Sequence, residues 1–187
     1  MRSDAPAAVL PWQGVIAGAV GGLAASWAME QFQSRFSQAT EDGVDEAQRR
    51  SGHEARWSAR SQDQLTGQPE PATTAAGDAA AITALGRPLT LEEEDAGGPL
   101  MHYAFGAAVG ALYGAIAESR PGVTRLAGIP FGMGVWATAD EVGVPAVGLS
   151  AAPWERPLRA HTYSVLSHAV YGLTTEAVRR LVRSALP

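Results

Sequence analysis

Most of the histidines and several acids of this chain lie within or at the ends of long uncharged segments. Ionisable side chains are costly in apolar surroundings and normally pair with one another there. Histidine beside a carboxylate changes charge near neutral pH, and the two side chains together also suit several divalent metals. The residues expected to gather in such a cluster are Glu30, His102, Asp140, Glu141, His161 and His168.

The segments that hold these residues are too apolar for the surface of a water-soluble protein. Residues 5–29, 103–117 and 126–139 carry no charge, and residues 160–175 are uncharged apart from two histidines. A helix in water must present a polar stripe to the solvent, whereas about 20 apolar residues span a bilayer. These patterns predict an all-α polytopic membrane protein with four transmembrane helices. Two alternatives stay open: a soluble core covered by a large partner, and a cleaved signal peptide in place of the first helix.

The expected helices leave one long polar connection. The predicted order is an N-terminal tail at 1–11, helix one at 12–32, a polar loop with short helices at 33–99, helix two at 100–119, helix three at 124–142, an interfacial segment and loop at 143–160, helix four at 161–182, and a C-terminal tail at 183–187. Thr90 and Glu93 have the spacing of a capping box, which starts a further helical turn before Gly97. Pro130 is expected to kink helix three.

The arginines predict the orientation in the membrane. Most of those outside the long loop lie in the tails and in the connection between helices two and three, whereas only Arg156 and Arg159 lie between helices three and four. Because cytoplasmic loops are enriched in positive charge, both termini are expected in the cytoplasm. The net charge of -5 gives no reason to expect nucleic acid as a partner. The lipid bilayer is the expected partner, and a homo-oligomer or another membrane protein stays open.

Small residues recur at every fourth position of the expected helices. Between helices in lipid the hydrophobic effect supplies little attraction, and small residues allow the backbones to approach closely. The residues predicted to pack in this way are Gly14, Gly18, Gly22, Gly106, Gly110, Gly114, Gly128, Gly132 and Gly172.

Alternating helix directions place the cluster toward the non-cytoplasmic face, and Glu118 and Glu176 toward the cytoplasmic face. At a rise of about 1.5 Å per residue, His168 and Asp140 reach similar depths, so a direct pair between them is predicted. Three interpretations of the cluster remain open: a structural network, a proton-responsive site, and a metal or haem site. The candidate metal ligands are His102, His161 and His168.

Signatures of catalysis are missing from the sequence. The glycines lack the strand context and the following lysine of a phosphate-binding loop, no Ser/His/Asp set stands out, and there is no cysteine. We therefore expect a non-enzymatic protein with no catalytic residues and no cofactor, apart from the metal or haem left open above.

Several blocks of the sequence resemble a known family. They are GRPLTLEEEDAGGPLMHYAFGAAVGALYGAIAE, WATADEVGVPAVGLS and HTYSVLSHAVYGLTTEAVRR, with GVIAGAVGGLAASWAMEQFQ in helix one, and together they resemble the YagU-like family of bacterial inner-membrane proteins. The resemblance covers all the expected helices and implies a small polytopic plasma-membrane protein of unassigned activity. It implies no catalytic residues. The matching positions include His102, Glu118, Asp140, Glu141, His161, His168 and Glu176.

Two functions follow from this interpretation. In the first, a membrane-integral protein senses or moves protons through its carboxylate/histidine cluster, in an envelope or pH-stress role. In the second, the glycine faces make the protein an accessory subunit of another membrane protein. The oligomeric state and any substrate or ion stay open.

Overall fold

The computed structural model describes residues 11–51 and 72–187, and this part of the chain forms helices and turns without strands. The all-α class predicted from the sequence is therefore confirmed for the described residues. The elements in chain order are α1 (Pro11–Ser51), α3 (Ala72–Leu85), α4 (Leu91–Ser119), the 3-10 segment η1 (Pro121–Gly128), α5 (Ile129–Val135), the π-helix η2 (Trp136–Gly143), α6 (Val144–Ala146), η3 (Pro153–Glu155) and α7 (Leu158–Ala185).

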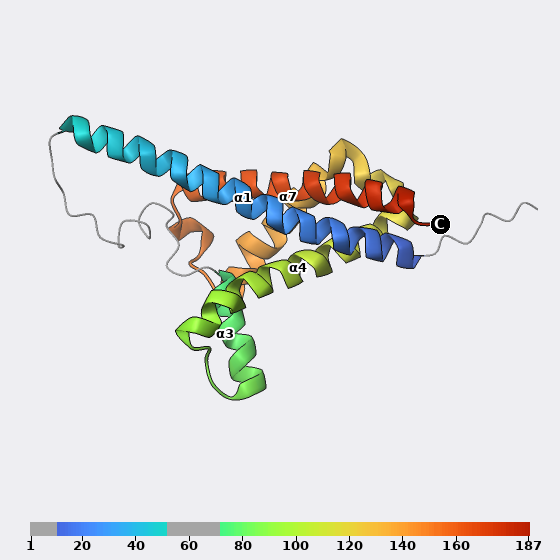
Figure 1. Cartoon of the computed structure of the whole chain (residues 1–187), viewed down its shortest axis with the longest axis horizontal. Coiled ribbons are helices and arrows are strands. Elements are labelled where there is room, and N and C mark those ends of the chain that lie inside the picture. The colour runs from blue at the N-terminus through green and yellow to red at the C-terminus, as the bar shows by residue number, and fades with distance from the viewer. Residues whose placement is uncertain (1–10, 52–71) are drawn as a thin grey trace, which may run out of the picture.

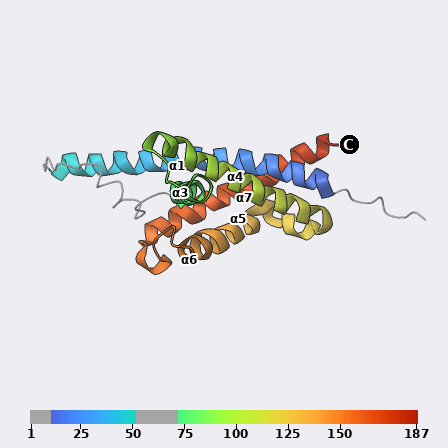
Figure 2. The ribbon, with the colours of Figure 1, turned by 90° about the horizontal axis from the view of Figure 1, so that it is seen from below.

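Three long helices form the body of the molecule (Figure 1). Helix α1 runs antiparallel to both α4 and α7 and packs against each of them. Helix α5 packs against α7, and Figure 2 shows α5 and α6 along α7, on the side opposite α1. The bundle thus has two ends, named here by a residue at each: the Glu176 end, near the C-terminus, and the Asp140 end, where η2 meets the start of α7.

Glycines bring α1 and α4 into backbone contact. A Cβ atom added at Gly18 would lie 2.9 Å from the Cα of Gly114, and one added at Gly110 would lie 2.8 Å from the Cα of Gly22. Real Cβ atoms do not approach backbone that closely, so only glycine allows this helix spacing. Gly14 and Gly106 occupy the two ends of the same contact.

Helix α7 is held by glycine contacts on two sides. A Cβ atom added at Gly172 would lie 2.9 Å from the backbone nitrogen of Gly132, on α5, and one added at Gly128, the last residue of η1, would meet the backbone of Gly172. On the α1 side, a Cβ atom at Gly21 would lie 2.6 Å from the carbonyl oxygen of Thr175. The glycines predicted to pack helices together therefore lie between helices of this one chain.

The first two long helices extend beyond their predicted bounds. Helix α1 continues to Ser51 where we predicted an end at residue 32, and α4 begins at Leu91 and runs without interruption, with Pro99 inside it. The capping box is present: the Thr90 side chain accepts from the Glu93 amide, and Glu93 accepts from the Thr90 amide at 2.8 Å. A hydrogen bond from Arg87 lowers the pKa of the Glu93 carboxyl to about 2. Most of the predicted 33–99 loop is thus helical where it is described.

The third predicted helix, 124–142, is wrong as a single regular helix. Leu126 and Ala127 have φ of 53° and 52°, and Gly128 has φ of 83°, so the chain turns through the left-handed region before α5 begins. Pro130 lies in the first turn of α5, where a missing N–H costs nothing. It therefore starts a helix, and the predicted kink is absent. The irregularity lies further on, in the π-helix η2.

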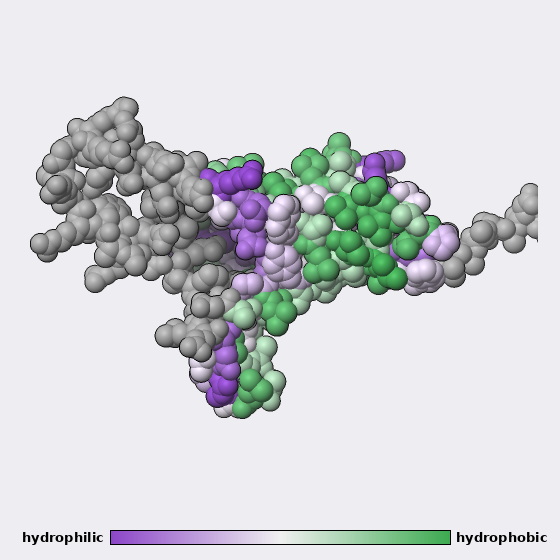
Figure 3. All heavy atoms as spheres, in the orientation of Figure 1, coloured by the Kyte–Doolittle hydropathy of each residue, from purple (hydrophilic) through white to green (hydrophobic). Residues whose placement is uncertain are grey.

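Several polar side chains are fully buried in this bundle, while many large apolar side chains lie on its surface. The largest fully buried side chains are Glu176, Thr175, Ser26 and Ser167. Apolar side chains point outward along the long helices, including Trp12, Ile16, Val20, Leu23, Trp27, Leu112, Ile116, Leu166, Leu173 and Leu181. Figure 3 shows the apolar surface as a zone along the bundle axis with hydrophilic residues toward either end.

We predict that the α1–α4 contact does not tolerate a single added methyl group. Gly18→Ala should lower the free energy of unfolding by about 1–3 kcal/mol, because the new Cβ overlaps the α4 backbone. Gly134→Ala is the matched control, since a Cβ added there meets nothing within 4 Å. The measurement is thermal unfolding of the detergent-purified variants. Equal midpoints for the two variants would contradict the close packing.

Candidate functional site

The π-helix η2 places two adjacent carboxylates at the Asp140 end of the bundle. Each turn of a π-helix holds an extra residue, and such turns occur frequently at functional sites. Asp140 and Glu141 both keep part of their side chains exposed, 21% and 14% respectively. The two acids therefore lie at the edge of the bundle interior, where partners from neighbouring segments reach them.

Arg156 is the cation that neutralises these acids. It directly follows η3, and its side chain is 1% exposed, with Nη2 at 2.6 Å from Glu141 Oε1 and Nη1 at 3.7 Å from Asp140 Oδ2. The geometry suits an ion pair rather than a hydrogen bond, since the guanidinium nitrogens lack hydrogen-bond partners among the described residues. Sequence reasoning missed this role, because a lone arginine in a loop carries no spacing that points to its partner.

His161 completes the group and is held between two acceptors. Its Nδ1 lies 3.0 Å from Glu141 Oε1, and its Nε2 lies 2.9 Å from the carbonyl oxygen of Pro153. A carbonyl oxygen only accepts, so Nε2 carries a proton; an ionised carboxylate also only accepts, which requires a second proton on Nδ1. The ring is then an imidazolium, unless the proton between His161 and Glu141 resides on the carboxyl group. We call Asp140, Glu141, Arg156 and His161 the Glu141 quartet.

The predicted direct pair between His168 and Asp140 is replaced by a bridge through Ser164. The Ser164 hydroxyl donates a short hydrogen bond to Asp140 Oδ2. His168 Nδ1 donates to the carbonyl oxygen of Ser164 at 2.9 Å and lies 3.4 Å from its hydroxyl oxygen. Because Ser164 and His168 are four residues apart on α7, one turn of helix separates the ring from the carboxylate. His168 and Asp140 therefore do not contact each other directly, and Ser164 connects them.

A cavity of about 530 Å³ lies beside these residues. His102, Asp140, His168 and Tyr171 line it together with apolar side chains from α1, α4, η2 and α6. Glu30 is not part of this group: it is exposed and accepts a hydrogen bond from Tyr103 at 2.7 Å. The prediction that Glu30 belongs to a buried cluster is therefore wrong, since its position on α1 faces outward.

The candidate metal ligands do not converge. No group of three His, Cys, Asp or Glu side chains within the described part of the chain is placed to hold a metal ion. His161 uses its two ring nitrogens in contacts with Glu141 and Pro153, and His102 places Nε2 at 3.4 Å from the carbonyl oxygen of Ser26. The geometry thus offers proton and hydrogen-bond chemistry at this end. His53 lies outside the described residues.

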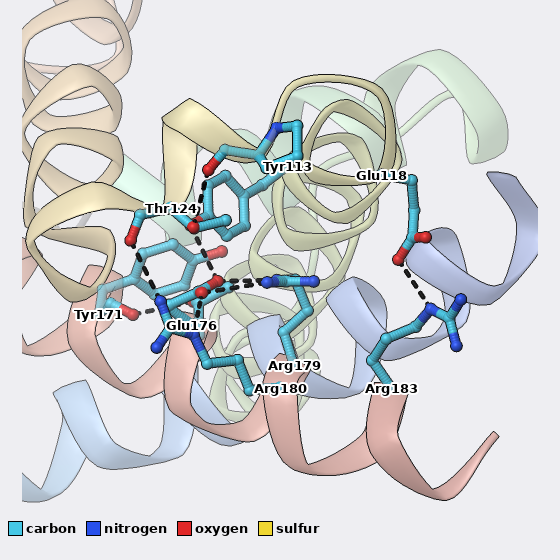
Figure 4. Close-up of polar contacts among 10 residues, drawn as sticks. Tyr113, Glu118, Thr124, Tyr171, Glu176, Arg179, Arg180 and Arg183 are labelled. Carbon is cyan, nitrogen blue, oxygen red and sulfur yellow. Dashed lines mark hydrogen bonds and ion pairs between the residues drawn. The ribbon is translucent and has the colours of Figure 1, made fainter. Parts of the chain in front are cut away.

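A second polar network occupies the Glu176 end (Figure 4). The Glu176 side chain is 1% exposed. It accepts from Tyr113 Oη at 2.9 Å and from Arg179 Nε at 2.7 Å, and Arg180 forms a further short ion pair. Nearby, Arg183 Nε donates to Glu118 at 2.9 Å. Sequence reasoning placed both acids at this end but missed their partners, although arginines three and four residues after Glu176 were the available signal.

The bundle contains two similar helix pairs, α1 with α4, and η1 and α5 with α7. Gly14 and Gly18 of α1 meet the carbonyl groups of Gly114 and Gly110, and in the same register Gly128 and Gly132 meet those of Gly172 and His168. Each partner helix carries Tyr-Gly followed by Glu four residues after the glycine, at 113–118 in α4 and 171–176 in α7. Four residues further along each helix, the first pair has glycine at both positions, Gly22 and Gly106, whereas the second pair has Trp136 and Ser164. The glycine contact ends there, and the cavity lies beside that point.

A family model described as "Protein of unknown function (DUF1440)" matches residues 48–177. The chain belongs to this family. The match includes the whole Glu141 quartet and the cavity residues of α4, η2 and α7, and it begins after the glycines of α1. It agrees with the uncharacterised family expected from the sequence, while the YagU-like name stays a resemblance. Neither a curated protein nor a solved structure matches the chain.

We predict that the two acids at the Glu176 end, Glu176 and Glu118, differ strongly in their contribution to stability. Glu176→Gln should destabilise the fold by about 3–5 kcal/mol, because it leaves Arg179 buried without its counter-charge. Glu118→Gln, at the equivalent position of the other helix pair, should cost about 1 kcal/mol or less, since its partner Arg183 is 32% exposed. Thermal unfolding in detergent compares them, and a larger loss for Glu118→Gln would contradict the network described here.

Proposed function

We propose that this protein is an integral protein of the bacterial plasma membrane that crosses the bilayer four times and binds and releases a proton at the Glu141 quartet. The observation that supports the membrane assignment is the distribution of polarity: the largest fully buried side chains are glutamate, threonine and serine, while leucine, isoleucine, valine and tryptophan point outward. A water-soluble protein would expose its charges and bury those apolar side chains.

The lengths of α4 and α7 agree with this proposal. At about 1.5 Å per residue, the 28 residues of α7 and the 29 of α4 exceed the roughly 30 Å hydrocarbon thickness. By length and composition, one helix within the described residues, Ala96–Ser119, is long and apolar enough to cross a membrane. The helices α1 and α7 have lower average hydropathy because they hold buried polar side chains such as Gln13, Ser26 and Glu176. A buried polar face is compatible with a membrane bundle, because lipid touches only the outer face.

The proton role rests on the position of His161 between two acceptors. With Arg156 and the imidazolium positive and Asp140 and Glu141 negative, the quartet is neutral. Loss of the imidazolium proton leaves one net negative charge in a partly buried group and removes the attraction between His161 and Glu141. Histidine is the side chain whose ordinary titration range lies between pH 5 and 8, so we assign the exchanged proton to the contact between His161 and Glu141.

The glycine faces give less support to the accessory-subunit alternative. The nine predicted packing glycines contact other helices of the same chain, and a partner would have to displace α4 or α7 to use them. We therefore place the function at the Asp140 end rather than on the glycine faces.

We expect residues on opposite ends of the bundle to lie on opposite sides of the membrane. The chain has no cysteine, so single cysteines can be introduced without removing native ones. In intact cells, a membrane-impermeant maleimide should label Trp154→Cys, whose native side chain is 84% exposed. Gly122→Cys, in the α4–α5 connection, should react only after the membrane is permeabilised. Equal labelling of both before permeabilisation would contradict four spans with cytoplasmic termini.

We expect Glu141 to determine where the ring protons of His161 lie, because its carboxylate is the acceptor that faces Nδ1. The measurement is ¹⁵N NMR of histidine-labelled protein in lipid nanodiscs, with Glu141→Gln as the variant that removes the second acceptor charge. The variant should shift the ¹⁵N signals of His161, while the signals of His168 stay in place. Unchanged His161 signals in Glu141→Gln would refute the proton role.

A further inference from the structure

We propose that the cavity at the Asp140 end binds an amphipathic organic cation, with a primary ammonium head and an apolar body. The inference rests on the cavity and the atoms that line it, and it does not depend on proton exchange by the Glu141 quartet. The volume of about 530 Å³ lies within the range of about 300–1,000 Å³ typical of small-molecule pockets.

The cavity opens where the close glycine contact between α5 and α7 ends. Gly132 holds α5 against the α7 backbone, with its would-be Cβ 3.1 Å from the Cα of Gly172. Beyond Val135 the chain becomes a π-helix and carries Trp136 in place of the next small residue, so η2 cannot stay as close to α7. The opening is bounded by α1 and α4 on the other side, through Met29 and Phe105.

His168 contributes a hydrogen-bond acceptor to this cavity. Its Nδ1 points at the carbonyl oxygen of Ser164, at 2.9 Å, and a carbonyl cannot donate. The ring proton is therefore on Nδ1 when the ring is neutral, and Nε2, on the far side of the ring, carries a lone pair. His168 lines the cavity, so the group it offers to a ligand is an acceptor.

His102 and Asp140 offer acceptors as well. The contact of His102 Nε2 with the carbonyl oxygen of Ser26 places the proton on Nε2 and the lone pair on Nδ1. The contacts of Asp140 with Ser164 and Arg156 both engage Oδ2, so Oδ1 stays available as a carboxylate acceptor. Arg156 lies 2.6 Å from Glu141 against 3.7 Å from Asp140 and does not line the cavity.

The remaining polar lining adds no cation. Tyr171 donates its hydroxyl hydrogen to the carbonyl oxygen of Gly106 at 2.7 Å, and Gln33 carries a neutral amide that can accept. A cavity with a carboxylate and two imidazole acceptors is complementary to a head group that donates several hydrogen bonds and carries positive charge. A primary ammonium has three donors and no acceptor.

The rest of the lining suits an apolar body. Met29, Met101, Phe105, Val135 and Val147 provide most of it. Methionine adapts to ligands of varied shape, and the face of a phenyl ring attracts a nearby cation. A bare metal ion fits less well, because no three His, Cys, Asp or Glu side chains of the described residues are placed to hold one.

The test uses three probes that share one body: 4-phenylbutylamine, 4-phenylbutanol and 4-phenylbutyrate. Binding to the full-length protein is measured by calorimetry in nanodiscs of phosphatidylglycerol, with protein-free nanodiscs subtracted. We expect the amine to bind at least tenfold more tightly than the alcohol, and the carboxylate not to bind. Equal binding of amine and alcohol, or binding of the amine only to the protein-free nanodiscs, would overturn the proposal.

Two variants locate the site and one serves as a control. Asp140→Asn should weaken amine binding at least tenfold, and Ala139→Leu, which fills the cavity and keeps every charge, should abolish it. Glu118→Gln removes an acid at the opposite end and should leave the affinity unchanged. If Asp140→Asn does not fold, Ala139→Leu decides alone, and unchanged amine binding in Ala139→Leu would refute the cavity as the site.

A further arm separates a free amine from a lipid head group with the same chemistry. Adding phosphatidylethanolamine to the nanodiscs should lower the apparent affinity for the amine if a lipid ammonium occupies the cavity, and should leave it unchanged if the natural ligand is a free amine. Both results support an ammonium site. Failure of the amine to bind, with the His161 NMR signals still dependent on Glu141, would overturn this inference and leave the proton role standing.

Discussion

Backbone-to-backbone contact between helices is the constraint on which the rest of this structure depends. Gly18, Gly110 and Gly172 have no side chain to separate the helices, so carbonyl oxygens and Cα atoms of one helix lie directly against the next. Such contact gains dispersion energy and needs no water to be expelled, which suits a bilayer. It also fixes the helix register, because a shift along the axis would bring a larger side chain into the contact. The same register determines which polar side chains lie opposite each other at the two ends of the bundle.

The two ends use that register differently. At the Glu176 end the acid is surrounded by Tyr113, Arg179 and Arg180, so its buried charge is fully compensated. At the Asp140 end the charges are paired less completely: Arg156 makes ion pairs without hydrogen bonds, and the carboxylates stay partly exposed. A fully compensated network stabilises a fold, whereas a partly compensated one beside a cavity can respond to a proton or a ligand.

The difference between the two ends follows from a difference between the two helix pairs at the Asp140 end. Both pairs have the same glycine register and the same tyrosine, glycine and glutamate positions on the second helix. In the first pair the glycine contact continues to Gly22 and Gly106, and the helices stay closed. In the second pair His168 lies where the first has Gly110, and Asp140 lies where it has Ser26. The residues of the candidate site thus occupy positions that serve packing in the other pair, and a π-helix accommodates them.

The sequence by itself determined the helical class, the packing glycines and the end of the bundle at which each acid or histidine lies, because these follow from local composition and from the helical period. It did not determine which side chains pair. Arg156 and Pro153 come from a loop without periodicity, and only the tertiary structure brings them to Glu141 and His161. The structure also removed Glu30 from the cluster, since one helical position decides whether a side chain faces in or out. The cavity could not be predicted from the sequence either. It depends on where η2 separates from α7, and residue spacing within one helix does not give the distance between two helices.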